Sequence, residues 1–499
     1  MRGLRPRQWS RALGNTLAST ALLACSPHDV THDPQAPVEL PETYGGEQTA
    51  QAPKPGGEAD ADPGRWWQQF GDPELNRLVS AALEGNFDLQ GAWARLAQAN
   101  AMADQAGAPR WPALDLSVGG AENRRIFSFP GIGNRSVWIE SASASAAVSY
   151  EVDLWDKLGS GAKAASLERD AAADSVEVMA MSLSAEISEA WLDLVEVRAR
   201  RALLQSQQEI NERFLELLEM RLGQGLSTAV DINQQKQMVI DNAAQLELTI
   251  SREATLENRI AVLTGKPPGR LDVAARSELP QPPALPAVGV PSELLRRRPD
   301  VRAARRRVEA ADYRLAAAIA DRYPSIQLTG SVSSQPSSLN EWLLTPLWSL
   351  AGSIAAPIFD GGRRAAEVDR QHAIVSESIA SYANTLLTAI LEVENALAQA
   401  GQQRKHIEQL EEQLEVAELT LQQARERYAN GLSDFLTVLT VLRSQQQVEL
   451  SLLAARRQLL SHRIQLCRAL GGSWMAELQP PELLKPRDAE RDEERGGSS

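Results

Sequence analysis

The chain is organised around the stretch Arg427–Arg443, which reads RYANGLSDFLTVLTVLR. Its Asn-Gly pair interrupts two long proline-free segments rich in helix-forming residues, and such a break predicts the tip of a helical hairpin. A second tip is predicted at Arg221–Asp231, RLGQGLSTAVD, because the shared Gly-Leu-Ser aligns Gly225 with Gly431. Two tips half a chain apart indicate an internal duplication.

Composition and net charge favour a protein of extended helices that does not bind nucleic acid. The chain has 499 residues but only 5% aromatic residues, which favours extended helices over a compact core. The formal net charge of −14 argues against a nucleic-acid partner. Basic runs at residues 296–298 and 305–307 alternate with Asp300, Glu309 and Asp312, so we expect them to lie on solvated helix faces.

The N-terminus has the pattern of a secretory signal, since arginines precede a modest apolar segment at residues 12–24. It ends in Leu22-Leu23-Ala24-Cys25, which resembles the lipobox of bacterial lipoproteins. That resemblance implies that Cys25 carries the lipid. The proline-rich stretch after it predicts a flexible tether, and Cys467, the second cysteine, is expected to be a buried thiol.

Each half of the chain also contains two segments of alternating polarity. Apolar residues alternate with polar ones at residues 114–118 and 138–150, and again at 326–332 and 348–356. We place polar loops at about residues 122–136 and 333–345 between them. An apolar face opposite a serine-rich face suits a strand with lipid on one side and water on the other, although a half-buried strand of a soluble sheet fits equally well.

The remaining segments predict a helix opened by Asp72-Pro73, with the proline at its first position. They then predict three helices per half: one before the strands, a long one after them, and a return helix beyond the tip. These are Phe87–Ala108, Lys163–Gly223 and Ser227–Thr264 in the first half, and Arg297–Arg322, Arg363–Asn430 and Ser433–Leu470 in the second. The long helices, of about 60 and about 68 residues, match the summed lengths of the two shorter ones. We therefore expect the shorter helices to stack end to end beside the long one.

Four strands cannot close a barrel, and lipid tolerates no open sheet edge. Several copies must then share one barrel, with about eight, twelve or sixteen strands for a dimer, trimer or tetramer. The residues alone do not select among these. No segment has the roughly 18 consecutive apolar residues of a transmembrane helix, which leaves the strands as the spanning candidates.

From about Trp66 to Trp474 the chain resembles the TolC/OprM-like outer membrane channels of tripartite efflux pumps, in their lipoprotein branch. The motifs that carry the resemblance are Trp66–Phe70 (WWQQF), Asp72–Leu75 (DPEL), Arg297–Ala303 (RRPDVRA), Pro357–Arg363 (PIFDGGR) and the two tips. The resemblance implies a mixed α/β membrane protein. In that fold a homotrimer forms a twelve-stranded outer membrane β-barrel with four strands per chain, continued by a long α-helical coiled-coil periplasmic tunnel.

The expected organisation follows from the motifs and the duplication. It comprises a lipoprotein signal peptide at 1–24, an acylated N-terminus and flexible linker at 25–64, a first repeat at 65–268, a connector at 269–291, a second repeat at 292–475 and a disordered tail at 476–499.

The resemblance implies a passive exit duct, anchored in the cell outer membrane and extending into the periplasm. Its implied partners are a periplasmic adaptor protein and an inner membrane transporter, of the resistance-nodulation-division type. Two alternatives remain: the duct of a type I protein secretion system, and a periplasmic coiled-coil scaffold without a pore. We expect no enzyme activity, cofactor or metal, because no metal-ligand spacing connects His28, His32, His372, His406 and His462.

The tips are the implied contact site for the adaptor. The residues concerned are Gly225, Leu226 and Ser227 in the first tip, and Gly431, Leu432 and Ser433 in the second. Glycine permits the turn, serine can cap the return helix, and an exposed leucine offers an apolar contact. The alternative is that these residues only make the turn.

The resemblance also implies a gate near the tips. Its latch maps to Tyr428 and Asp231, and its aperture lining maps to Leu436, Thr437 and Thr440. Some members of the family carry aspartates at the two threonine positions, so we expect this aperture to lack their acidic rings. The alternative for Asp231 is a solvated carboxylate near a helix N-terminus.

Overall fold

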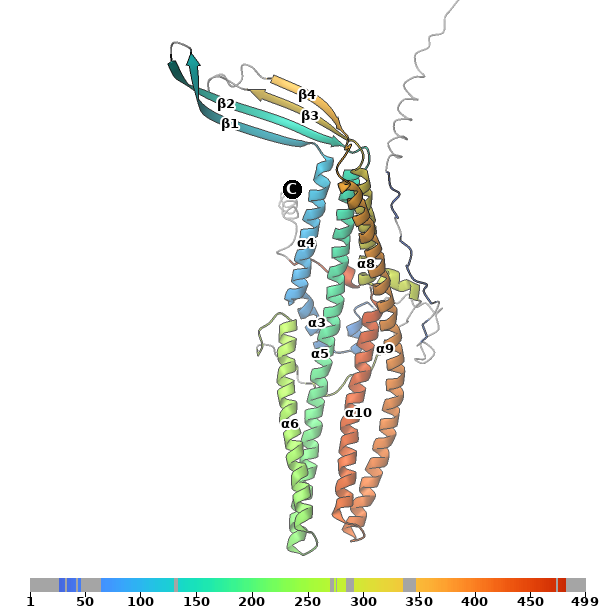
Figure 1. Ribbon diagram of the computed structural model, residues 1–499. Helices are drawn as coiled ribbons and strands as arrows, with labels where there is room; N and C mark the ends of the chain where they lie inside the picture. The colour runs from blue at the N-terminus through green and yellow to red at the C-terminus, as the bar shows by residue number, and fades with distance from the viewer. Residues whose placement is uncertain are drawn as a thin grey trace, which may run out of the picture. The chain divides into compact units, whose positions relative to one another are not determined.

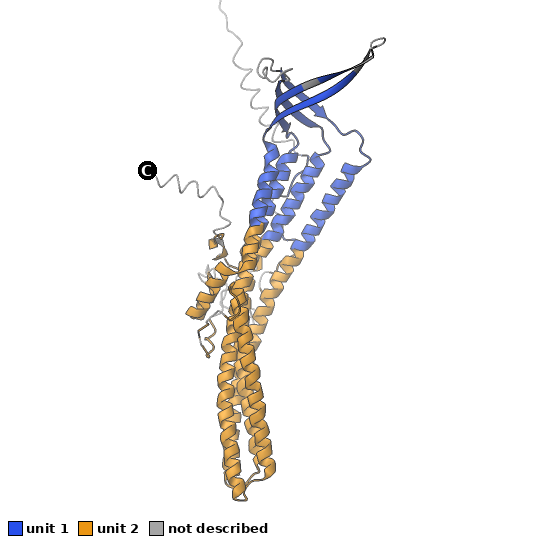
Figure 2. Cartoon of the chain, turned by 90° about the vertical axis from the view of Figure 1, so that its left-hand side faces the viewer, with its two compact units in different colours: residues 1–37, 96–172, 303–382 blue, residues 38–95, 173–302, 383–499 orange. Residues whose placement is uncertain are grey.

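The computed structural model describes residues 27–31, 34–41, 44–45, 64–129, 133–269, 273–274, 276–283, 291–334, 347–472 and 474–481. Cys25, the predicted signal peptide and most of the predicted tail lie outside these residues. The chain forms two compact units, residues 1–37, 96–172 and 303–382 in one and residues 38–95, 173–302 and 383–499 in the other (Figure 2). Each unit draws on both halves of the sequence.

The order of elements repeats, as the duplicated tips predict (Figure 1). The first half contains η1 (Trp66–Phe70), α3 (Pro73–Gly85), α4 (Phe87–Gly107), η2 (Ala108–Arg110), β1 (Ala113–Phe129), β2 (Gly133–Val152), α5 (Lys157–Gly223) and α6 (Ala229–Leu263). The second contains η3 (Pro291–Glu293), α7 (Leu294–Arg297), α8 (Pro299–Ala320), β3 (Ser325–Ser334), β4 (Leu347–Ala355), α9 (Arg363–Ala429), α10 (Phe435–Leu470) and η4 (Trp474–Glu477).

The strands form one antiparallel sheet in the order β1-β2-β3-β4. One face exposes apolar side chains such as Leu116 and Trp348. The other carries cross-strand serine pairs, with 2.7 Å between the Ser117 and Ser145 hydroxyl oxygens. The predicted alternation is therefore confirmed, and among the strands that the structure describes β1 and β4 each keep one unpaired edge.

The first strand pair is longer than predicted, because most of the polar stretch expected as a loop at 122–136 continues the ladder. β1 runs to Phe129 and β2 begins at Gly133. Arg124 faces Trp138 in this register, with its guanidinium carbon 5.7 Å from the ring centroid, and its Nη2 donates to Ser136 Oγ at 3.2 Å. Cross-strand contacts of this kind stabilise polar residues within a sheet.

The first long helix begins at Lys157, six residues before the predicted Lys163. Its first turn includes Gly159, whose amide donates to Asp153 Oδ2 at 2.7 Å, so a side-chain cap compensates for a residue that disfavours helix. α5 and α9 each have 67 residues, or about 100 Å. The interval from Lys157 to Arg363 equals that from Gly225 to Gly431, 206 residues (431 − 225).

Each return helix lies alongside its long helix (Figure 1). Gln235 of α6 donates to the Asn211 carbonyl of α5 at 2.7 Å, and Gln403 of α9 donates to the Ala455 carbonyl of α10 at 2.9 Å. An apolar cluster joins α9 to α10 through Ile407, Leu410, Leu452, Ala455 and Leu459. The predicted coiled-coil seam on α9 is thus confirmed in this part of the helix.

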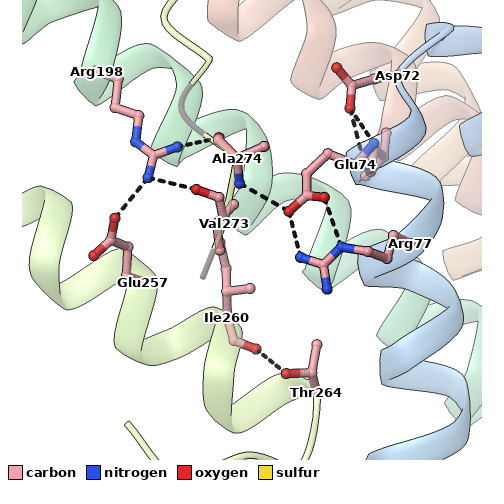
Figure 3. Close-up of polar contacts among 10 residues, drawn as sticks. Asp72, Glu74, Arg77, Arg198, Glu257, Ile260, Thr264, Val273 and Ala274 are labelled. Atoms are coloured by element: carbon pink, nitrogen blue, oxygen red, sulfur yellow. Dashed lines mark hydrogen bonds and ion pairs between the residues drawn. The ribbon is translucent and has the colours of Figure 1, made fainter. Parts of the chain in front are cut away.

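A short piece of the connector joins the helices of the first half (Figure 3). Arg198 of α5 donates to Glu257 of α6 at 2.8 Å and to the Ala274 carbonyl at 2.6 Å. The Ala274 amide in turn donates to Glu74 of α3 at 3.2 Å. One buried guanidinium therefore bridges a return helix and the connector.

The prediction that the basic runs lie on solvated faces is wrong for Arg298. This side chain is buried and forms ion pairs of 2.7 Å with both Asp300 and Glu392. Arg302 likewise pairs with the buried Asp174 at 2.9 Å. Acidic neighbours from other helices offset the desolvation of these cations, a tertiary effect that charge patterning along the chain does not show.

Cys467 is buried in α10, as predicted, and burial raises the pKa of its thiol to about 12. Among the described helices, α9 is long and apolar enough to cross a membrane by length and composition. α9 meets it through average hydropathy and not through a run of roughly 18 consecutive apolar residues, so it does not overturn the expectation that the strands span the membrane. Length and composition are weak evidence, because helices that pack against other helices meet the same criterion.

Described pieces of the predicted linker contact the body of the protein. His28 Nε2 lies 2.7 Å from Asp312 Oδ1 of α8, and the Gly45 amide donates to Glu394 of α9 at 2.7 Å. Tyr44 is buried. At these points the segment is held against the helices.

Candidate gate at the hairpin tips

Both tips make the same turn. In the first, the Leu226 amide donates to the Arg221 carbonyl at 2.9 Å and the Gly225 amide donates to the Leu222 carbonyl at 2.9 Å. In the second, the Leu432 amide donates to the Arg427 carbonyl at 2.8 Å. This bonding pattern is the Schellman motif, which satisfies the last carbonyls of a helix.

The motif explains both tip glycines. Gly225 and Gly431 each have φ of +73°, and a Cβ added at either would meet no atom within 4 Å. The backbone conformation and not crowding therefore requires glycine here. The predicted turn role of both residues is confirmed.

The caps of the return helices differ from the prediction. Thr228, not Ser227, caps α6, and its hydroxyl accepts from the Asp231 amide at 3.2 Å. Asp434, not Ser433, caps α10, and its carboxylate accepts from the Thr437 amide at 3.1 Å. Each return helix therefore begins one residue later than a serine cap would place it.

The turn does not require a leucine side chain at either tip. Leu226 is 59% exposed and Leu432 is 68% exposed. Each follows its glycine, a position where a leucine often packs back on the helix. Here both side chains face outward and form an apolar surface at the tips.

The structure does not join Tyr428 to Asp231 by a hydrogen bond within one chain. Oδ2 of Asp231 accepts from the Thr228 amide at 2.9 Å and from the Thr228 hydroxyl at 2.8 Å, which completes a capping box. The Tyr428 hydroxyl is buried and has no hydrogen-bond partner among the described residues.

Tyr428 instead contacts two side chains that were not among the predicted site residues. The guanidinium carbon of Arg221 lies 4.6 Å from the centre of its ring, and the Phe435 ring centroid lies 5.7 Å away. An apolar cluster beneath it joins all four helices of the tips through Leu218, Met238, Leu421, Ala424, Phe435, Val438, Leu439 and Leu442. The two tips therefore share one core.

A groove of about 450 Å³ opens beside Tyr428, between α5 and α9. It is mainly apolar, with arginines at its edge, and its lining consists of Ile210, Arg213, Phe214, Leu217, Arg221, Arg425, Tyr428, Ala429 and Val438. Arg425 lies with its guanidinium carbon 4.9 Å from the centre of the Phe214 ring.

The predicted aperture residues occupy the first two turns of α10. Leu436 is 51% exposed. The Thr437 hydroxyl donates to Asp434 at 2.6 Å and the Thr440 hydroxyl donates to the Leu436 carbonyl at 2.8 Å. The hydrogen bonds from Thr437 lower the pKa of the Asp434 carboxyl, so the carboxylate of this turn is engaged as a helix cap.

Solved structures with this fold are outer membrane channels. The structure of the outer-membrane channel OprN aligns with a TM-score of 0.81 at 28% identity, over 89% of this chain and 99% of that one. The outer membrane protein VceC from Vibrio cholerae aligns with a TM-score of 0.77 at 27% identity, over 82% of this chain and 99% of that one.

The chain belongs to the outer membrane efflux protein family, which matches residues 78–266 and 290–472. The pyoverdine export outer membrane protein OpmQ of Pseudomonas aeruginosa is 30% identical over 430 residues, 85% of this chain and 90% of OpmQ. The outer membrane protein OprJ of the same organism is 30% identical over 467 residues, 92% of this chain and 95% of OprJ. The resemblance to the outer membrane channels of efflux pumps is confirmed, as is the fold class of barrel strands joined to long helices. The protein is an outer membrane efflux channel.

Proposed function

We propose that the chain acts as the homotrimeric exit duct of a tripartite efflux pump. The observation that carries the proposal is a four-stranded sheet with two open edges, joined in one chain to two helices of 67 residues. An unpaired edge is not tolerated in lipid. Three copies pair β4 of one chain with β1 of the next and give about twelve strands, a size known for closed membrane barrels.

The proposed substrates are small molecules, delivered by an inner membrane transporter of the resistance-nodulation-division type through a periplasmic adaptor. The names of several relatives support this class: pyoverdine export for OpmQ and toluene efflux for TtgF of Pseudomonas putida. The exposed Leu226 and Leu432 form the proposed adaptor contact, together with the glycine and serine of each tip. The helices carry substrate passively, since transport energy is supplied by the partner.

The gate we propose uses Tyr428 and Asp231 as its latch and Leu436, Thr437 and Thr440 as its aperture. Within one chain Tyr428 has a buried hydroxyl without a partner, and Oδ1 of Asp231 accepts no hydrogen bond from the described residues. Because the Tyr428 hydroxyl is buried, the proposed latch bond needs a local rearrangement of the tips that brings this hydroxyl to Oδ1 of Asp231. Threonines in the aperture leave it without an acidic ring, so millimolar divalent cations should not block it.

The lipid anchor we propose is Cys25. Metabolic labelling with a palmitate analogue should mark the wild-type protein but not the Cys25→Ser variant. Labelling of the variant would show that the lipid is attached elsewhere.

The exit-duct proposal is tested by expressing the full chain, together with an adaptor and a transporter of the resistance-nodulation-division type, in a strain that lacks its own efflux duct. The chain should restore resistance to small toxic compounds, and the purified protein should form channels in planar bilayers. A protein that is extracted without detergent and forms no channels would instead be a periplasmic scaffold. The latch is tested separately, because Asp231→Ala and Tyr428→Phe should both raise conductance.

A further inference from the structure

We propose that the two hairpin tips of each chain are held together by a reciprocal pair of cation–π contacts, which we call the tip clasp. It consists of Arg221 against Tyr428 and Arg425 against Phe214. Its role is to hold α10, which carries the aperture residues, against the first hairpin and so to keep the channel closed. The inference rests on the proposed exit-duct function and concerns how that duct is gated.

The geometry of the tip clasp is reciprocal. α5 contributes one ring and one cation, Phe214 and Arg221, and α9 contributes Arg425 and Tyr428. The guanidinium carbons lie 4.6 Å and 4.9 Å from the ring centres that they face, within the range of about 6 Å over which a cation is attracted to a ring. Because each helix gives the cation to one contact and the ring to the other, the two contacts together oppose sliding of α5 along α9.

The two arginines have no competing acidic partner among the residues that the structure describes. Neither Arg221 nor Arg425 forms an ion pair there, and Nε of Arg221 is buried without a hydrogen-bond acceptor. The neighbouring Arg213 behaves differently, because its guanidinium pairs with Glu209 at 3.4 Å. Arg221 and Arg425 are thus placed by the rings and not by a carboxylate.

The Tyr428 ring is fixed in position by the tip core. It packs at 5.7 Å from Phe435 and contacts the buried cluster around Leu218 and Val438. A ring held in an apolar environment gives a stronger cation–π contact than an exposed one, because less water competes for the cation. Because Tyr428 of α9 also packs on Phe435, the first residue of α10, a displacement of α9 at the clasp moves the start of α10.

The internal duplication supplies a matched control. The same interval that relates Gly225 to Gly431 relates Arg221 to Arg427 and Leu222 to Tyr428. The first tip has a leucine where the second has the ring, and Arg427 has no ring within cation–π distance in the described chain. Arg221 and Arg427 are thus equivalent in the two repeats, but of the two only Arg221 faces an aromatic ring among the described residues, and the clasp requires such a ring.

The tip clasp and the latch make different demands on Tyr428. The latch needs its hydroxyl, whereas the clasp needs only its ring. Tyr428→Phe should therefore leave the clasp intact, and Tyr428→Leu should abolish it while keeping an apolar side chain. A rise in conductance for Tyr428→Leu beyond that for Tyr428→Phe measures the loss of the ring, which includes the clasp and the packing on Phe435; the arginine variants separate the two.

The experiment uses the purified full-length protein in planar bilayers. We expect Arg221→Gln and Arg425→Gln each to raise the fraction of time spent open by about threefold, and the double variant to raise it by about tenfold. Arg427→Gln should match the wild type. The exchanged variant, Arg221→Tyr with Tyr428→Arg, restores a cation against a ring and should close more often than either single change.

Two results would overturn the clasp: wild-type closure in the double glutamine variant, or equal opening on substitution of Arg427. Failure of the exchanged variant to close better than its single parents would also contradict it. Each variant should keep the oligomeric state of the wild type in detergent, which shows that it folds and assembles. If the wild-type protein forms no channel and restores no resistance, the proposed function fails, and the clasp fails with it.

Discussion

The two tips make the same turn but cap the helix after it in opposite ways. In the first tip Thr228 is the cap and Asp231 is the third helical residue. In the second, Asp434 is the cap and Thr437 is the third helical residue. The same two residue types exchange places, so the turn is preserved while the carboxylate moves from inside the helix to its start.

A second difference lies one residue after each cap. α10 begins with Phe435, which is only 2% exposed, whereas α6 begins with Ala229 at the equivalent position. At this position only the second tip places a large side chain in the shared core. The comparison teaches that the start of α10 is anchored by packing and the start of α6 mainly by its hydrogen-bonded cap.

The largest effect is expected from Phe435→Ala, which gives the second tip the residue of the first. Removal of a buried phenylalanine should destabilise the start of α10 by about 3 to 5 kcal/mol. Hydrogen exchange followed by mass spectrometry on peptides covering residues 430–445 would measure this loss. Leu436→Ala, on the exposed side of the same turn, is the control and should change exchange little. Equal effects of the two substitutions would mean that the second tip is not anchored by packing.

The tip glycines should respond alike, because their backbone geometry is the same. Gly225→Ala and Gly431→Ala should each cost about 1 to 2 kcal/mol, the strain of a left-handed conformation in a residue with a Cβ. Exchange of the Leu226 and Leu432 amides, which close the two turns, reports the loss. A loss of stability at only one of the two tips would show that the turns are not equivalent.

A somewhat smaller effect is expected from Thr228→Ala, which removes the cap of α6 and should cost about 1 kcal/mol. The double variant Thr228→Asp with Asp231→Thr copies the second tip into the first and should recover most of this loss. Faster exchange of the Asp231-position amide in the single variant, and near wild-type exchange in the double, would support the interpretation. If the exchanged pair is as unstable as the single variant, the two caps are not interchangeable.

The smallest effect concerns pH. Hydrogen bonds from Thr437 lower the pKa of Asp434 below its usual value of 3.8, so the folded state favours the carboxylate. This contribution is fully present above about pH 4 and is lost as the pH falls through the lowered pKa. Exchange at the start of α10, corrected for the intrinsic effect of pH, should therefore accelerate in acid. Asp434→Asn, which keeps an acceptor but does not titrate, should remove this dependence.

Much of the architecture was predictable because it rests on periodic patterns. Alternation predicted the strands, and a Gly-Leu-Ser repeat between proline-free segments predicted both tips. The errors have a common physical cause: local polarity and glycine content predict the loop at 122–136 and the helix start at Lys163, but they do not report contacts with residues elsewhere in the fold. Side chains from other residues, Trp138 and Asp153, stabilise these segments in the fold.

The site was less predictable than the fold. The predicted turn accounts for the two glycines. The cap residues could not be predicted, because the sequence does not show at which residue the Schellman motif ends. Arg221 and Phe435 could not be selected, because their contacts with Tyr428 join residues from three helices. One signal was present in the sequence: Tyr428 and Phe435 are aromatic where the other repeat has Leu222 and Ala229, and a difference between repeats marks a position that duplication alone does not explain.

The equal length of α5 and α9 has a consequence for how this chain can change over evolutionary time. A residue inserted into one 67-residue helix rotates everything beyond it by about 100° and advances it by about 1.5 Å. The two tips would then lose their shared core. We therefore expect an insertion or deletion in one of these helices to be tolerated only together with a matching change in the other, so that the two halves of the channel change length together.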